Sequence, residues 1–288
     1  ALVGASHAPF AAPVLLTAFG MTLVIATGGV DLSVGAIIAI TGAVAALALT
    51  RTPLAVPSVV ALALGAAVLA GLWNGLLVAV FAVPPIVATL VLMVAGRGVA
   101  QLLTDGQIVT FERPAFGFIG SGHLCALPFS VTLVAAAGVL TAVLTRRTAL
   151  GLFIEASGNN ETASRYAGVN VRLVKLLVYA WCGLTAGVAG LIVAADIKAA
   201  DANNAGLYFE LDAILAVVIG GTALTGGRFS LLGTLVGGLL IQALTTTILT
   251  RGVPVEFTLV VKAAVVLAVC LLQSDVLRAA LFRPRRAA

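Results

Sequence analysis

Long runs of apolar residues, separated by short polar stretches, make up most of this chain. A helix needs about 20 predominantly apolar residues to cross the hydrocarbon core of a bilayer, and nine segments approach that length. They are residues 9–27, 33–50, 57–82, 86–103, 130–145, 176–195, 211–225, 229–249 and 257–273. Whether the shortest, 211–225, crosses completely stays open. The pattern predicts an all-α polytopic membrane protein with about nine transmembrane segments and an internal repeat.

Composition indicates a single transmembrane domain over residues 1–288. Hydrophobic residues make up 61% of the chain and charged residues only 9%, against about 25% charged in soluble domains. No polar stretch is long enough to form a separate catalytic domain. Glycines four residues apart predict helices that approach closely. These pairs are Gly71 with Gly75, Gly183 with Gly187, and Gly233 with Gly237.

Basic residues gather in two places and set the predicted orientation. One group begins at Arg146 and Arg147 and continues through the loop 146–175, and the other lies in the tail 274–288. Cytoplasmic loops carry the excess of Lys and Arg, so we expect both groups in the cytoplasm. Alternation then puts Ala1 outside. Since proteins of this type usually start inside, we expect one further N-terminal span and ten spans in the complete protein.

The motif Gly28–Gly35, Gly-Gly-Val-Asp-Leu-Ser-Val-Gly, puts a carboxylate between two apolar segments. An ionisable residue at such a place needs a partner or has a task. Asp-Leu-Ser before an apolar run is also a good helix start, because a carboxylate there accepts backbone N–H groups. We therefore expect Asp31 to cap a helix that restarts here. Direct contact with a substrate is the alternative.

The second half of the chain repeats this motif at Gly220–Gly227, Gly-Gly-Thr-Ala-Leu-Thr-Gly-Gly. Interrupted helices at matching positions mark the functional centre of many transporters. Ala223 stands where Asp31 does, so what recurs is the backbone geometry and not the acid. The repeat predicts two helix breaks built on Gly28, Gly29, Asp31, Ser33, Gly35, Gly220, Gly221 and Gly227, with Thr225 matching Ser33. Alternation puts both breaks on the cytoplasmic side, whereas an incomplete crossing by 211–225 would invert the repeat.

The loop 146–175 contains the signals of a short helix. Asn159 or Asn160 can cap residues Glu161–Tyr166, and Gly168 can end them. We expect a small amphipathic helix on the cytoplasmic face. It either rests on lipid headgroups or docks a cytoplasmic partner.

Signatures of catalysis are missing from the sequence. There is no Gly-x4-Gly-Lys-Ser/Thr loop, no His-Glu-x-x-His and no Gly-x-Ser-x-Gly, and the three cysteines match no metal pattern. We therefore expect neither an enzyme nor a metal site. Asn74, Gln101 and Gln242 are polar residues within spans that could line a path for a substrate. Arg97 and Lys262 could bond another helix or extend toward the interface.

Three stretches identify a family resemblance. They are residues 27–35, 155–171 and 211–228. With these motifs the chain resembles, over nearly its whole length, the permease subunits of bacterial ABC sugar importers of the ribose type. Residues 99–111 and 194–206 are similar to the permeases of galactofuranose importers.

The resemblance implies a permease of the inner membrane that moves a monosaccharide, with galactofuranose expected, from periplasm to cytoplasm by alternating access. The implied partners are a cytoplasmic ABC ATPase, which would hold ATP and Mg²⁺, a second permease subunit, identical or related, and a periplasmic sugar-binding protein. No cofactor on this chain and no nucleic acid are expected. The binding protein would dock on the outer loops 104–129 and 196–210. The ATPase would dock on Glu155, Asn159, Asn160, Glu161, Arg165, Tyr166, Gly168, Asn170 and Arg172.

Two alternatives remain at this point. The chain could import another sugar, such as ribose, or a branched-chain amino acid, although a charged substrate would require converging charged groups. It could also be an ATP-independent secondary transporter with Asp31 or Lys262 as a proton relay. Replacing Asp31 by Asn separates a relay from a cap, since Asn also caps helices well.

Overall fold

The apolar segments fold into a bundle of helices. The computed structural model describes residues 8–124, 126–251 and 255–273. Within these ranges the helices are α1 (Ala8–Ala26), α2 (Val34–Arg51), α3 (Val56–Ala79), α4 (Pro85–Leu103), α5 (Pro114–Ser121), α6 (Phe129–Arg146), α7 (Ala149–Asn159), α8 (Glu161–Tyr166), α9 (Val171–Ile197), α10 (Phe209–Ile219), α11 (Leu231–Thr250) and α12 (Val255–Gln273). Each predicted segment corresponds to one helix, which confirms the all-α polytopic class. Helices α5 and α7 were not predicted.

Six of these helices are long and apolar enough to cross a membrane. They are α2, α3, α4, α6, α9 and residues 231–248 of α11. Helix α10 has 11 residues, about 16 Å of helix, which is about half of the hydrocarbon core. The segment expected at 211–225 therefore crosses only partly as a helix. The total of nine spans, or ten with a further N-terminal one, stays a prediction.

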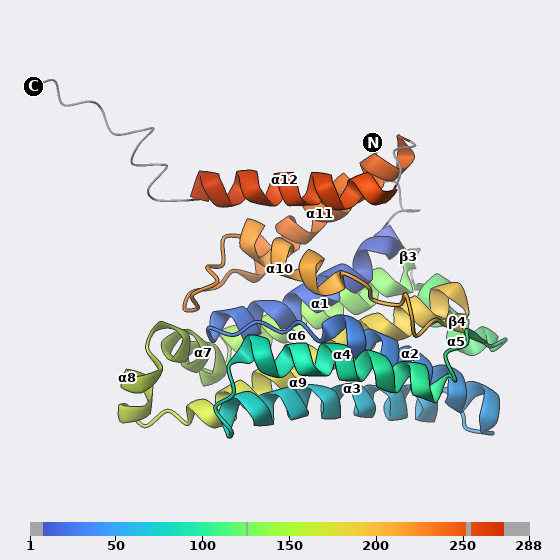
Figure 1. The fold of residues 1–288 in the computed structure, drawn as a ribbon, viewed down its shortest axis with the longest axis horizontal. Coiled ribbons are helices and arrows are strands. Elements are labelled where there is room, and N and C mark those ends of the chain that lie inside the picture. Colours follow the sequence, from blue (N-terminus) through green and yellow to red (C-terminus); the bar gives the residue numbers. More distant parts are fainter. Residues whose placement is uncertain (1–7, 125, 252–254, 274–288) are drawn as a thin grey trace, which may run out of the picture.

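Helix α9 forms the centre of the bundle. It packs against α1, α2 and α3 (Figure 1). Glycines allow this close approach: an ideal Cβ on Gly71 would lie 3.1 Å from the Cα of Gly183, and one on Gly187 would lie 2.5 Å from the Cβ of Ala67. The predicted small-residue contacts are thus confirmed here, and also where Gly233 and Gly237 of α11 meet α10.

The two ends of the bundle differ. Helices α7 and α8 lie together at one end, and β4 and α5 lie at the other (Figure 1). At that second end β1 (Val109–Thr110) pairs antiparallel with β4 (Ala199–Ala200). There too, β2 (His123–Leu124) pairs antiparallel with β3 (Leu127–Pro128). The strand pair β1–β4 thus ties together the two loops that were predicted to lie outside.

The chain between β4 and α10 runs back into the bundle without regular structure. Ala202 packs in a buried cluster with Ala39 and Ala43 of α2. Further along, an ideal Cβ on Gly206 would lie 2.8 Å from the Gly35 carbonyl oxygen, near the start of α2. The loop predicted to lie outside at 196–210 therefore does so only in part: residues 201–208 follow α2 into the bundle, and α10 completes the crossing. Both predicted helix breaks consequently lie at the same end, as alternation of the spans predicted.

Replacing Gly71 by Ala should lower the thermal stability of the detergent-solubilised protein. The new Cβ would collide with the Tyr179 carbonyl oxygen and the Gly183 backbone, and overpacking costs about 1–3 kcal/mol. Gly65→Ala on the same helix is the matched control, because nothing lies within 4 Å of its ideal Cβ. That control should keep or slightly raise the melting temperature, since Ala favours helix by about 1 kcal/mol over Gly. Equal melting temperatures for the two variants would contradict the close packing of α3 on α9.

Candidate functional site

The first helix break has the hydrogen bonds of a glycine-ended helix. Gly28 has φ +78°, its N–H donates to the Ile25 carbonyl, and the Gly29 N–H donates to the Val24 carbonyl. These bonds satisfy carbonyls at the end of α1 that would otherwise be left unpaired. The phenol oxygen of Tyr179 also lies only 2.7 Å from an ideal Cβ on Gly29. Glycine is therefore required at both positions of the pair.

The second break ends α10 in the same way, displaced by one residue. Here Gly221 has φ +86°, its N–H donates to the Val218 carbonyl, and the Thr222 N–H donates to the Val217 carbonyl. In the first break the first glycine of the pair, Gly28, has the left-handed backbone conformation. In the repeat it is the second glycine of the pair, Gly221. The predicted breaks at both motifs are thus present.

The restart of the second helix corrects the sequence alignment. Thr225 was matched to Ser33, but α11 begins at Leu231, and the side chain of Ser230 accepts the Gly233 N–H at 3.0 Å. Ser230 is therefore the capping hydroxyl of the repeat. The loop of the second break is longer, so the hydroxyl moves away from the position that simple alignment gives it. The signal in the sequence is a serine directly before an apolar run.

Asp31 shapes the first restart from a fully buried position. Its Oδ1 accepts the Ser33 N–H at 2.9 Å and the Ser33 hydroxyl at 2.6 Å. Ser33, not Asp31, is the N-cap residue of α2, so Asp31 closes the turn before the helix instead of capping its first turn. The Asn74 amide donates to the Ser33 Oγ at 2.8 Å. Since Asn74 is fully buried in this cluster, it supports the turn and presents no exposed atom to a path.

The two breaks meet at a contact that we call the glycine junction, made of residues 26–29, 226–227 and Gly158. The Gly227 N–H donates to the Ala26 carbonyl, the last of α1, at 2.9 Å. An ideal Cβ on Gly226 would lie 2.8 Å from the Gly28 nitrogen. One on Gly158, near the end of α7, would collide with the Ala26 carbonyl and lie 2.5 Å from the Gly227 nitrogen. The junction thus joins α1, the loop before α11 and α7 through backbone.

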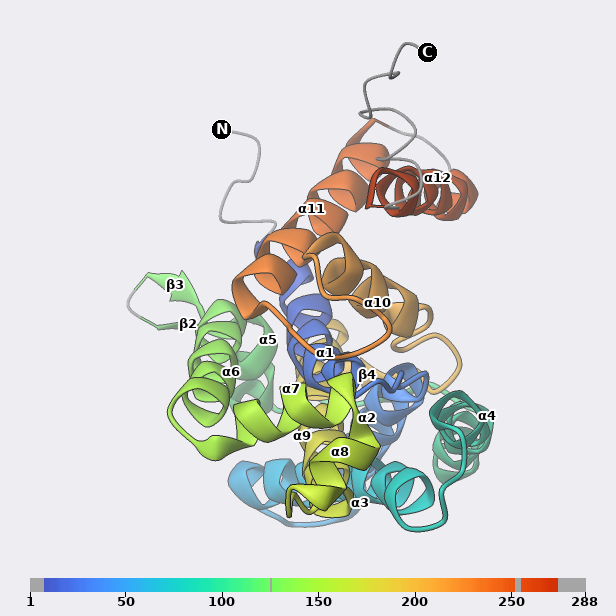
Figure 2. The same cartoon turned by 90° about the vertical axis from the view of Figure 1, so that its left-hand side faces the viewer.

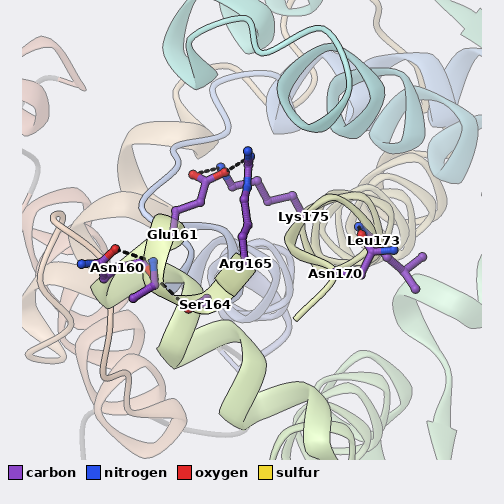
Figure 3. A network of polar contacts seen from close by, with 8 residues as sticks. Asn160, Glu161, Ser164, Arg165, Asn170, Leu173 and Lys175 are labelled. Atoms are coloured by element: carbon purple, nitrogen blue, oxygen red, sulfur yellow. Dashed lines mark hydrogen bonds and ion pairs between the residues drawn. The ribbon is translucent and has the colours of Figure 1, made fainter. Parts of the chain in front are cut away.

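The short helix α8 follows the junction and has the predicted bounds Glu161–Tyr166. The Asn160 Oδ1 accepts the Ala163 N–H at 2.9 Å, and the Ser164 hydroxyl donates to the Asn160 carbonyl at 2.9 Å (Figure 3). Gly168, with φ +87°, ends the helix. The cap, the helix and its end are as the sequence predicted, and Asn160 is the capping residue. Asn159 instead lies beside Gly227, where its Oδ1 would be 2.5 Å from an ideal Cβ.

One ion pair fixes α8 to the start of α9. Glu161 pairs with Lys175 at 2.7 Å and with Arg165 on its own helix (Figure 3). Burial raises the pKa of the Glu161 carboxyl, but the hydrogen bonds and charges of Lys175 and Arg165 outweigh it and leave that pKa below its ordinary value. Asn170 caps α9 by accepting the Leu173 N–H at 3.1 Å.

The outer face of this region is open. Tyr166 is 89% exposed, and Arg172 is also exposed. Glu155, half-buried on α7, lines a cavity of about 450 Å³ together with Thr145, Arg146, Gly151, Leu152, Phe229 and Leu231. Figure 2 shows α7 and α8 covering this end of the bundle. The exposed side chains, a cavity and the rigid helix pair form a surface that can receive another protein.

The remaining polar residues of the spans separate into different environments. Gln101 is half-exposed and donates to the Asn203 side chain at 2.7 Å. Gln242 is half-buried on α11. Lys262 of α12 pairs with Asp212 of α10 through both carboxylate oxygens, at 2.7 and 2.8 Å. In the part of the chain that the structure describes, no cluster of three or more His, Cys, Asp or Glu side chains could hold a metal ion.

Comparison with known proteins finds a permease family and relatives that are themselves named as permeases. A family described as branched-chain amino acid transport system, permease component, matches residues 6–270. The galactofuranose transporter permease protein of Escherichia coli K12 is 59% identical over 92% of this chain and 77% of its own length. The ribose import permease protein of the same strain is 42% identical over 88% of this chain and 79% of its own. The fructose import permease protein of Bifidobacterium longum is 40% identical, over 90% and 74%. No solved structure matches.

Replacing Asp31 by Asn should leave the thermal stability nearly unchanged, whereas replacement by Ala should lower it. An Asn oxygen can still accept from Ser33. Asp31 Oδ2 has no hydrogen-bond partner among the described residues, so an amide group in its place breaks no bond that the carboxylate makes. Ala would leave buried donors unsatisfied, at about 1–3 kcal/mol. The measurement is thermal denaturation in detergent. An Asn variant as unstable as the Ala variant would show that the negative charge, and not the turn, is what the fold needs.

Proposed function

This chain belongs to the family of permease components of branched-chain amino acid transport systems, and we propose that it is the permease subunit of an ATP-driven monosaccharide importer. It is a transport component and a multi-pass protein of the inner membrane, with helices long and apolar enough to span. The proposal adds the direction, from periplasm to cytoplasm, and the energy source. The observation that supports the proposal most strongly is the glycine junction, which joins the exposed α7–α8 surface to both helix breaks.

The relatives favour a sugar over an amino acid as the substrate. Although the family description names branched-chain amino acids, the three relatives compared above are named for galactofuranose, ribose and fructose. The highest identity of the three, 59%, belongs to the galactofuranose permease. We therefore propose galactofuranose as the substrate of this chain.

The surface of α7 and α8 is the proposed docking site for a cytoplasmic ABC ATPase. A partner that moves needs a rigid contact, and the Asn160 cap with the Glu161–Lys175 pair provides one. ATP and Mg²⁺ would bind on that partner, so the proposal assigns no cofactor to this chain. The complex would also contain a second permease chain, identical or related, and a periplasmic sugar-binding protein on the tied loops around β1 and β4.

The glycine junction suggests how the ATPase could change the path. A displacement of α7 at Gly158 would press directly on the end of α1 and on Gly227. Because these two backbones share a hydrogen bond, they would shift together. The two breaks are then the positions where α1 and α2, and α10 and α11, can change their relative tilt. Such a change alternates access only if the partners bind the two states with different affinity.

The acidic group and the basic group that were considered as proton relays both have structural partners. Asp31 organises the turn before α2, and Lys262 is held by Asp212. A secondary transporter that used Asp31 would lose uptake in the Asp31→Asn variant. The importer proposed here would keep it.

Reconstitution tests the importer directly. The chain is placed in proteoliposomes with its second permease, ATPase and galactofuranose-binding protein, and uptake of radiolabelled galactofuranose is followed. We expect uptake that requires both ATP on the cytoplasmic side of the permease and the loaded binding protein on its opposite side. A non-hydrolysable ATP analogue is the matched control and should give none. Uptake that persists without ATP would refute the proposal.

A further inference from the structure

A polar seam at membrane depth is not explained by the junction or by the docking surface. It consists of Arg97 and Gln101 on α4 and of Asn203 and Asn204 in the irregular segment 201–208. This segment follows α2, which is one of the helices able to span a membrane. Arg97 and Gln101 lie in the last two turns of α4, which is also able to span. The seam therefore begins near the outer end of the spans and runs into the membrane, where polar groups are costly unless they have partners or a function.

The segment is held in one shape by its own hydrogen bonds. Asp201 Oδ1 accepts the backbone N–H groups of Asn203 and Asn204 at 3.0 and 3.1 Å, and its Oδ2 accepts the Asn204 amide at 2.8 Å. Arg97 donates to the carbonyls of Ala202 and Ala205 at 3.2 and 2.6 Å. Gly206 and Tyr208 then adopt left-handed conformations. The seam is thus a built feature, clamped on both sides.

The side chains on the seam remain uncovered by this chain. Asn203 and Asn204 are exposed, Gln101 is half-exposed, and Tyr208 is 45% exposed. Beside them, Gly98, Gln101, Leu102, Asp105 and Gly106 line a cavity of about 400 Å³. Non-helical backbone at membrane depth is tolerated only where protein buries it or where it lines a water-filled space. Because exposed amides are costly against lipid, this face does not meet the hydrocarbon.

We propose that the seam lines the sugar path and that Gln101 and Asn203 contact the sugar's hydroxyl groups. This inference rests on the importer function proposed above and adds the residues of its path. Side-chain amides offer both donors and acceptors, as hydroxyl groups require. The charge of Arg97 is opposed by Glu210 and Asp201, so the seam suits a neutral polyhydroxy ligand. The opposite wall then comes from the second permease chain.

Cysteine labelling tests whether the seam faces water. Asn203→Cys is made in a background in which Cys125, Cys182 and Cys270 are replaced by Ala. Leu69→Cys on α3 is the control for a lipid-facing surface, since Leu69 is apolar and 67% exposed. A charged, membrane-impermeant methanethiosulfonate is added to proteoliposomes that hold the whole complex. Thiolates react in water, so we expect Asn203→Cys to react about tenfold faster than Leu69→Cys or more. Equally slow reaction would overturn the proposal.

Sugar contact is tested with the double variant Gln101→Ala, Asn203→Ala. Both partners of one hydrogen bond are removed together, and Arg97 and Asp201 keep their backbone contacts, so the segment should keep its shape. We expect uptake to fall about thirtyfold, from two lost hydrogen bonds worth about 1 kcal/mol each. ATP hydrolysis stimulated by the loaded binding protein should stay nearly unchanged. Unchanged uptake would overturn the contact to sugar. If the native complex showed no ATP-driven uptake, the importer function would fail, and labelling would still decide whether the seam faces water.

Discussion

Backbone polar groups inside a membrane must find partners within the protein, and this requirement governs the whole arrangement. Where the protein itself excludes water, as at the buried end of α1, an interrupted helix likewise leaves N–H and carbonyl groups that another part of the chain has to satisfy. The last carbonyl of α1, Ala26, is satisfied by the N–H of Gly227 from the other break. Each break thus completes the other. Only glycine lets the two backbones and the end of α7 come so close.

The same requirement shapes the irregular segment 201–208, but there the solution uses side chains. Asp201 accepts its N–H groups, and Arg97 donates to its carbonyls. A backbone held by polar side chains leaves side-chain amides exposed on its open side, whereas the junction joins backbone directly to backbone. The first solution is suited to a surface that a solute passes. The second is suited to a joint that transmits movement.

Periodicity and capping chemistry predicted the long apolar helices, the short helix α8 with a cap at Asn159 or Asn160, and both breaks, because these depend on neighbouring residues, but not α5 or α7. What depends on distant partners was not predicted. Ser230 replaced Thr225 as the restart hydroxyl because the second loop is longer, and Asn74 became a support of the Asp31 turn because α3 packs there. Asn203 and Asn204 lay in the loop 196–210, which was noted for its family resemblance and as a docking loop for the binding protein, and not for a path. A polar run after a spanning helix is the signal that could have marked them.

The central claim is that the glycine junction carries motion from the α7–α8 surface to the helix breaks. It is tested most directly by the sugar uptake per ATP hydrolysed in proteoliposomes, compared between Gly158→Ala and Gly117→Ala. A Cβ on Gly158 would enter the junction, while nothing lies within 4 Å of one on Gly117. In complexes that purify with the ATPase bound, the account predicts that Gly158→Ala still hydrolyses ATP but loses most of its uptake per ATP, and that Gly117→Ala matches the native protein. Equal coupling in the two variants would contradict it.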